Sequence, residues 1–153
     1  MVRAFDRKTG KQIWANDWAG SMRVPFYAAK NGSWVRSTPA TDGKTLFVGG
    51  MRDVLVAIDV ETGKEKWRRD YPSEEKTPLP SFGFVSSPLL DKDHIYVQVG
   101  TAMRKIKKND GKTVWQSLAD ERAMFGSAFS SPFRTTIQGV DQILVQTRST
   151  LSA

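Results

Sequence analysis

Two Gly-Lys-Thr triplets, at 43–45 and 111–113, are the residues that first suggest chemistry in this sequence. Such a triplet is typical of the end of a phosphate-binding loop, but that loop also needs a glycine five positions earlier. Those positions hold Thr38 and Ile106, so we expect both triplets to be ordinary turns. His94 is the only histidine and has no partner for a triad or a metal site, and the absence of cysteine excludes thiol chemistry. We therefore predict no catalytic residue, no metal site and no cofactor.

A second group of residues suggests binding instead of catalysis. Aromatic residues interleaved with glycine occur at 81–84 and 124–129, just before two equivalent Ser-Ser-Pro segments, and Phe26, Tyr27 and Trp34 occupy the corresponding stretch upstream. Aromatic side chains beside arginines commonly form ligand or partner sites on loops. The candidate binding residues are Arg52, Asp53, Phe82, Phe84, Phe125 and Arg148. The alternative interpretation is that the phenylalanines fill the space between structural repeats.

A repeat in the chain defines the elements that would position these residues. The stretch 57–67 reads as a β-hairpin, with an apolar strand, a turn that Asp59 caps and a glycine, Gly63, that supplies positive φ. The same stretch occurs at 4–14, and a degenerate copy occurs at 105–115. The residues that mark the three copies are Asp6, Gly10, Trp14, Asp59, Gly63, Trp67, Gly111 and Trp115. Three copies in one chain indicate a repeat protein.

Each unit of the repeat contains four short strands and no segment that predicts a helix. A Ser-Pro or Thr-Pro strand, a second strand and the hairpin follow one another, and about 50 residues of four strands are typical of a propeller blade. The expected units are a half blade at 1–19, a blade at 34–70, a blade at 85–118 and a half blade at 128–153. The sequence thus predicts an all-β fold, an arc of four-stranded antiparallel blades that begins at a third strand and stops after a second strand.

The pattern Ala-x-Asp-x-x-Thr-Gly-x-x-x-Trp resembles the tryptophan-docking repeat of the quinoprotein-type (PQQ-like) β-propeller family. The first two copies match at all five positions, whereas the third keeps only Gly111 and Trp115. In that family the tryptophan packs between neighbouring blades. Because propellers need about four to eight blades to close, the resemblance implies that this chain is one part of a larger ring.

The family includes quinone-dependent dehydrogenases and a scaffold lipoprotein of outer-membrane β-barrel assembly, so fold alone does not decide function. The dehydrogenases resemble one another in a vicinal cysteine pair, a calcium site and an aspartate base; this sequence has no cysteine and no acidic cluster. We therefore favour a non-catalytic binding or scaffolding module that acts outside the cytoplasm, as the resemblance implies. The alternative is a fragment of a quinone (PQQ)-dependent dehydrogenase whose remaining blades carry those groups.

The composition sets wider bounds on function. A hydrophobic content of 39% and a charged content of 25% are typical of a folded globular chain, and no apolar run approaches the roughly 20 residues of a membrane-spanning helix. The formal charge of +7 would suit a nucleic-acid binder only if the positive side chains formed one continuous face. They are scattered through turns and strand ends, so we expect no nucleic-acid partner.

The blade topology also predicts where the binding residues lie. Loops between blades share one rim with the turns that join second and third strands, so the candidate residues should gather on that rim. The turns at Asp6, Asp59 and Asp110 should lie on the opposite rim. We expect a protein or a small molecule to bind at the first of these rims.

Overall fold

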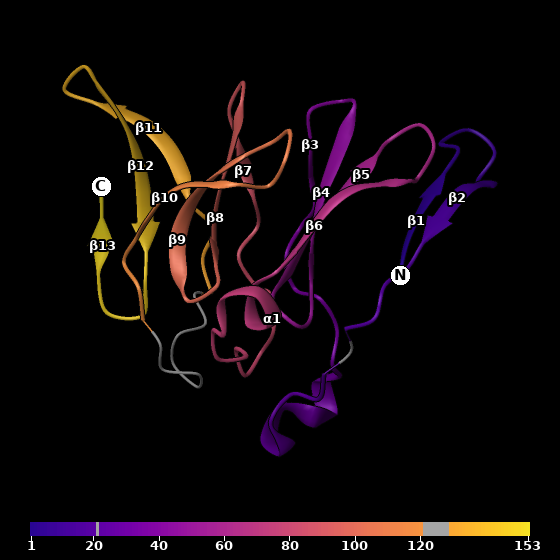
Figure 1. Cartoon of the computed structure of the whole chain (residues 1–153), viewed down its shortest axis with the longest axis horizontal. Coiled ribbons are helices and arrows are strands. Elements are labelled where there is room, and N and C mark those ends of the chain that lie inside the picture. The colour runs from indigo at the N-terminus through magenta and orange to yellow at the C-terminus, as the bar shows by residue number, and fades with distance from the viewer. Residues whose placement is uncertain (21, 121–128) are drawn as a thin grey trace.

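The protein is mostly β-structure, arranged as four antiparallel sheets that stand side by side (Figure 1). The computed structural model describes residues 1–20, 22–120 and 129–153. The first sheet pairs β1 (Val2–Phe5) with β2 (Gln12–Asn16). The second contains β3 (Ala40–Thr41), β4 (Thr45–Gly50), β5 (Val54–Asp59) and β6 (Glu65–Asp70). The third contains β7 (Leu89–Leu90), β8 (His94–Val99), β9 (Ala102–Lys107) and β10 (Thr113–Ser117). The fourth contains β11 (Phe133–Ile137), β12 (Val140–Gln146) and β13 (Leu151–Ser152).

These sheets are the blades of a β-propeller arc, and we call them the first to fourth blades in chain order. Within each blade, neighbouring strands in sequence pair antiparallel, as the repeat predicts. The fourth blade differs from the expected half blade in one respect. After β12 the chain turns and pairs Leu151–Ser152 with Val145 and Gln146, so part of a third strand is present.

Local hydrogen bonds explain why the repeated hairpin forms. The Oδ1 atom of Asp59 accepts bonds from the Thr62 backbone N–H at 2.9 Å and the Thr62 hydroxyl at 3.0 Å. Asp6 and Thr9 make the same pair of bonds at 2.7 and 2.8 Å. The third copy has Lys107 at the aspartate position and lacks this cap. Its backbone nevertheless keeps the turn, since the Lys107 carbonyl accepts the Gly111 N–H at 3.0 Å.

The tryptophans of the first two hairpins dock on the hairpin of the next blade. The Trp14 indole N–H donates to the Val60 carbonyl at 2.8 Å, and the Trp67 indole N–H donates to the Lys108 carbonyl at 2.8 Å. Gly63 lies under the Trp14 ring, where an added Cβ would come within 2.6 Å of the indole. Glycine is therefore required at this position by the close approach of the ring as well as by its φ of 71°.

A second chain of hydrogen bonds links the segments just before β3, β7 and β11. The Thr38 backbone N–H donates to the Ser87 hydroxyl at 2.8 Å, and the Ser87 N–H donates to the Ser131 hydroxyl at 2.9 Å. Each of these three residues precedes a proline at the start of its blade. The residue before proline favours extended backbone, so its N–H is held pointing at the next blade instead of closing a helical turn.

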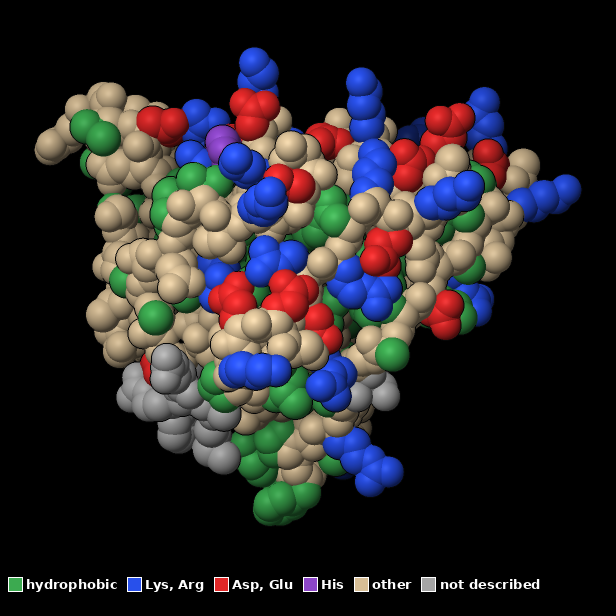
Figure 2. All heavy atoms as spheres, in the orientation of Figure 1, with side chains coloured by type: hydrophobic (Ala, Val, Ile, Leu, Met, Phe, Trp, Pro, Cys, Tyr) green, Lys and Arg blue, Asp and Glu red, His purple; other side chains and the backbone are tan. Residues whose placement is uncertain are grey.

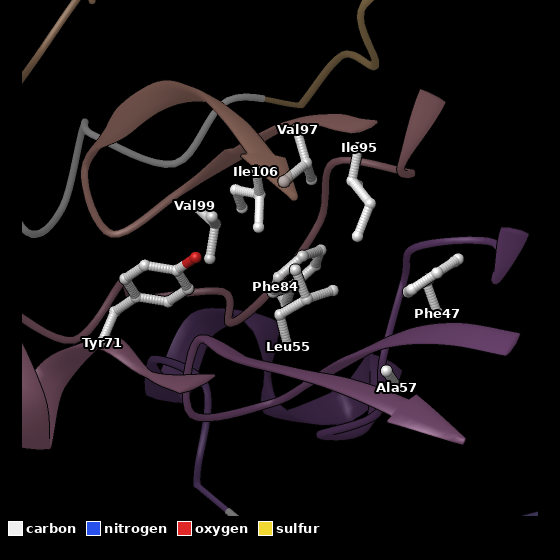
Figure 3. Packing of buried hydrophobic residues seen from close by; sticks show 9 residues of the cluster. All are labelled: Phe47, Leu55, Ala57, Tyr71, Phe84, Ile95, Val97, Val99 and Ile106. Carbon is white, nitrogen blue, oxygen red and sulfur yellow. The ribbon is translucent and has the colours of Figure 1, made fainter. Parts of the chain in front are cut away.

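The largest hydrophobic core lies between the second and third blades (Figure 3). Leu55 and Phe84 pack there with Ile95, Val97 and Ile106, all of which have at most 1% of their surface exposed. Both faces of β5 are covered, so its sequence is continuously apolar instead of alternating. This packing sets the relative position of the two complete blades.

Two short helices interrupt the β-structure where the sequence predicted none. Helix α1 (Tyr71–Glu75) follows β6, and a 3₁₀ helix, η1 (Phe26–Asn31), lies between the first and second blades. Asp70 caps α1 by accepting the Ser73 N–H at 3.2 Å, and its own N–H donates to Glu74 at 2.8 Å. This reciprocal cap, with Pro72 in the first turn, stabilises a helix too short to show apolar periodicity.

Candidate binding face

The two ends of the blades differ in structure. One end carries the turns β1–β2, β5–β6 and β9–β10, which contain Asp6, Asp59 and Asp110 (Figure 1). The other end carries the turns β4–β5, β8–β9 and β12–β13 together with η1 and α1, and we call it the connector face. The separation of the aspartate turns from the β4–β5 and β12–β13 turns is the arrangement that four-stranded antiparallel repeats predict.

Four aromatic rings form a continuous strip on the connector face. Ring centroids are 5.6 Å apart between Phe26 and Tyr27, 6.4 Å between Tyr27 and Phe82, and 5.3 Å between Phe82 and Phe129. We call these four residues the aromatic strip. They come from η1 and from two loops between blades. Phe26 is 90% exposed and Phe129 is 66% exposed, so the strip is surface and not core.

The loop at 81–84 holds the middle of this strip in place. Phe84 is only 1% exposed and packs over Gly49, where an added Cβ would come within 2.2 Å of its ring. Gly83, with φ of 73°, lies against the Met51 carbonyl. Phe84 therefore anchors the loop in the core, and Phe82, two residues earlier, is half-buried within the strip. Burial removes Phe84 from the set of candidate binding residues and agrees with the alternative of inter-blade packing.

Arg36 connects the segment that follows η1 with the loop that carries Phe82. Its guanidinium donates to the carbonyls of Trp34 and Phe82, each at 3.3 Å, and to the carbonyl of Gly32 at 3.4 Å. Sequence reasoning did not single out Arg36, because a lone arginine between aromatic residues carries no recognisable motif. Its three carbonyl partners come from both sides of the inter-blade boundary, so it fixes one loop relative to the other.

Asp53 has a structural position and not a surface one. Its side chain is 4% exposed, and Oδ2 accepts the Gly100 backbone N–H at 2.7 Å across the boundary between the second and third blades. Burial raises the pKa of the Asp53 carboxyl to about 6, although the Gly100 N–H and the charge of Arg104 oppose the shift. The sequence prediction of Asp53 as a rim residue is thus replaced by a role in joining blades.

The two candidate arginines lie on the connector face. Arg52, in the β4–β5 turn, is partly exposed and its side chain lies beside Gly20. Arg148, between β12 and β13, is exposed. Phe125 lies outside the described residues.

A buried charged cluster, which the sequence did not reveal, ties α1 to the third blade. The Arg104 side chain is 4% exposed; it pairs with Glu75 at 2.8 Å and donates to the carbonyls of Val99 and Gly100, both at 3.1 Å. Its guanidinium lies 4.7 Å from the centre of the Tyr71 ring. Burial raises the pKa of the Tyr71 phenol, so this hydroxyl stays protonated and is unsuited to act as a base.

His94 and its neighbours show no sign of a catalytic or metal centre. Asp91 caps the β7–β8 turn, and its carboxylate lies 3.4 Å from His94 Nδ1 and accepts the Tyr96 hydroxyl at 2.9 Å. A cavity of about 420 Å³ opens beside these residues toward the fourth blade, where Arg134 is already paired with Asp141 at 2.6 Å. Over residues 1–20, 22–120 and 129–153, no three His, Asp or Glu side chains are grouped to hold a metal.

Comparison with known proteins decides the family. A family model described as "Outer membrane protein assembly factor BamB" matches residues 1–153, the whole of this chain. The chain belongs to the BamB family. A BamB from Yersinia pestis is 23% identical over 145 residues, which is 92% of this chain and 34% of that protein. The described helices are far shorter than the roughly 20 residues that a bilayer requires, and none of them could cross one.

Two dehydrogenases are also similar to this BamB-family chain. The 1-butanol dehydrogenase (cytochrome c) of Thauera butanivorans is 30% identical over 105 residues, which is 67% of the chain but 14% of the enzyme. The quinohemoprotein alcohol dehydrogenase ADHIIG of Pseudomonas putida HK5 superimposes on 74% of the chain, and on 17% of the enzyme, with a TM-score of 0.56 at 23% identity. The chain spans about a third of the BamB and a seventh of the dehydrogenase relative. These comparisons show the propeller fold. The relatives include both an outer membrane protein assembly factor and dehydrogenases.

Proposed function

We propose that this chain is part of a non-catalytic propeller scaffold that acts outside the cytoplasm and binds another protein through the connector face. The observation that carries the proposal is the aromatic strip. Monomeric surfaces rarely present contiguous apolar rings without a partner, and aromatic residues are enriched at the centres of protein interfaces.

The architecture of the two ends supports this choice of face. Turns at the aspartate end are short and alike in the first two copies, because the Asp-Thr-Gly chemistry dictates them. Connections on the connector face differ from blade to blade in length and in secondary structure, with η1 in one and α1 in the next. Loops that vary on a rigid framework are where binding functions usually reside.

A site-specific photocrosslinking experiment tests the proposal in cells of the source organism. A photoreactive amino acid replaces Tyr27 in the strip, and in a matched control it replaces Thr62 in the opposite β5–β6 turn. We expect a discrete crosslinked species of higher mass from position 27 and none from position 62. Equal products from both positions, or none from position 27, would contradict binding at the connector face.

The second candidate function is a share in a quinone-dependent dehydrogenase, favoured by the 30% identity to the butanol dehydrogenase. Quinone and calcium sites of such enzymes need acidic and amide ligands, and the described residues contain no group of acids that could hold a metal. Titration of the chain with pyrroloquinoline quinone and calcium separates the two functions. We expect no saturable change in quinone absorbance, and a stoichiometric change would favour the dehydrogenase.

A further inference from the structure

The aromatic strip indicates the chemistry of the partner as well as its location. Resting on the proposed function, we propose that the strip binds an extended acidic segment of the partner protein, with apolar side chains at alternate positions. The spacing of the rings, their mutual orientation and the charges around them each contribute to this inference.

The spacing of the rings matches an extended chain. Successive centroids of the strip lie 5.3 to 6.4 Å apart. Side chains on one face of an extended strand recur every two residues, or about 6.6 Å. A segment with apolar residues at positions i, i+2 and i+4 can therefore place one side chain against each junction between rings, whereas the intervening residues point away from the strip.

The charges beside the strip are unmatched cations. Lys30 is on η1 and is exposed, Arg23 precedes η1 and is exposed, and Arg52 is partly exposed on the β4–β5 turn. None of the ion pairs within the described residues includes these three side chains. The neighbouring carboxylate of Asp53 is buried and bonded to Gly100, so it does not neutralise Arg52 at the surface. Carboxylates at the intervening positions of a bound segment would be attracted by these cations through solvent, over distances of one Debye length, roughly 10 Å.

The space-filling view agrees with this placement of cations beside the strip. Figure 2 shows hydrophobic side chains and Lys or Arg side chains together at the lower end of the molecule, over η1, whereas most of the Asp and Glu side chains in this view lie higher up and one lies at the lower left. Two of those acids, Glu74 and Glu75, already form ion pairs with Arg69, at 2.5 and 3.0 Å. The connector face therefore presents net positive charge at the aromatic strip.

A single-stranded nucleic acid is the other anionic polymer that aromatic rings and cations can bind, and ring orientation disfavours it. Bases stack on exposed ring faces. The rings of the strip meet edge to face, at interplanar angles of 80°, 62° and 63°, so each ring partly covers the face of the next. Such an arrangement offers grooves between rings for branched or aromatic side chains instead of flat stacking platforms.

Fluorescence anisotropy with a synthetic probe tests this inference on the full chain. The probe is a labelled peptide of sequence Asp-Phe-Glu-Leu-Asp-Phe-Glu-Leu, and its control replaces each acid with lysine. We expect saturable binding of the acidic peptide that weakens as salt rises, and at least tenfold weaker binding of the lysine peptide and of a labelled oligothymidine. Equal binding of the two peptides, or tighter binding of the oligothymidine, would overturn the inference.

Matched variants place the binding on the strip. Phe26→Ser with Tyr27→Ser removes two exposed rings, and Phe5→Ser with Ile13→Ser removes two apolar side chains of the first blade that are also more than half exposed. We expect the first pair to weaken acidic-peptide binding at least tenfold and the second pair to leave it within twofold. Lys30→Glu should weaken binding severalfold, whereas Lys11→Glu, in the β1–β2 turn, should not. Equal effects of the matched variants would also overturn the inference.

The peptide-binding experiment and the crosslinking experiment can fail independently of each other. A crosslink from position 27 combined with no binding of the acidic peptide would leave protein binding at the connector face intact and reject the acidic segment. Loss of both the crosslink and the peptide complex would reject the proposed function itself.

Discussion

The indole N–H of Trp67 donates a 2.8 Å hydrogen bond to the carbonyl of Lys108, in the hairpin of the next blade. The same ring lies over Gly111 of that hairpin, at a distance that leaves no room for a Cβ. Trp14 repeats both contacts with Val60 and Gly63. At these two boundaries one side chain thus makes both a directional bond and a packing contact, and this explains why tryptophan and glycine occur together in the repeat.

Glycine substitutions should separate the turn from the docking contact. Gly10, Gly63 and Gly111 have φ of 69°, 71° and 71°, but an added Cβ meets nothing within 4 Å only at Gly10. We expect Gly10→Ala to cost about 1 kcal/mol from backbone strain alone. Gly63→Ala should cost at least about 2 kcal/mol more, because the Trp14 ring must move. Urea unfolding measures both, and equal costs would show that the docking contact contributes nothing.

Trp67 and Trp115, at the same position of two copies of the repeat, should differ in their contribution to stability. Trp67 is partly buried and packs against the core between the second and third blades, so Trp67→Ala should cost about 3 kcal/mol, the low end of the range for a buried aromatic side chain. Trp115 is 40% exposed, so Trp115→Ala should cost less than half as much. Denaturant titration of the two variants provides the comparison. Similar losses would mean that Trp115 is packed as tightly as Trp67, contrary to its exposure.

The buried Asp53 carboxyl should make stability depend on pH. Its pKa is about 6 when folded and near 3.8 when unfolded, so between these values the folded protein binds more protons. Stability should therefore fall as pH rises from about 4 to about 6 and then level off. Asp53→Asn, which keeps an acceptor for the Gly100 N–H, should remove this slope.

A surface carboxylate serves as the control for that pH dependence. The Arg134 guanidinium lowers the pKa of the Asp141 carboxyl, so its contribution is present at neutral pH and lost as pH falls through the acid range. Asp141→Asn should leave the slope between pH 4 and pH 6 in place. Thermal unfolding at several pH values checks both variants, and an unchanged slope in Asp53→Asn would assign the effect to other groups.

Tyr71 offers a substitution that should stabilise the protein. Its ring is fully buried between Arg69 and Arg104, but the hydroxyl has no hydrogen-bond partner among the described residues. An unsatisfied buried hydroxyl costs about 1–3 kcal/mol. Tyr71→Phe keeps the ring contacts and should raise the free energy of unfolding by about 1 kcal/mol. A loss of stability would show that the hydroxyl has a partner after all.

Sequence alone determined the blade architecture, because its signals are local. The Asp-x-x-Thr-Gly turn forms from bonds within five residues, and the Asp59 and Thr62 contacts are those that the motif predicts. Apolar strands flank each turn, and a fourfold strand pattern repeated along the chain admits few folds other than a propeller. The same residues carried the resemblance to quinoprotein-type propellers, whereas membership of the BamB family rests on the family model that matches residues 1–153.

Only the tertiary structure decided which neighbouring side chains face solvent. Phe82 and Phe84 share one loop, and Arg52 and Asp53 are adjacent, yet in each pair the first residue is partly exposed and the second is buried. Gly10 and Gly63 have the same motif and the same φ, and differ only in whether a tryptophan from another blade covers them. Burial depends on contacts between segments about 50 residues apart, and a pattern read along a single blade carries no information about the blade beside it.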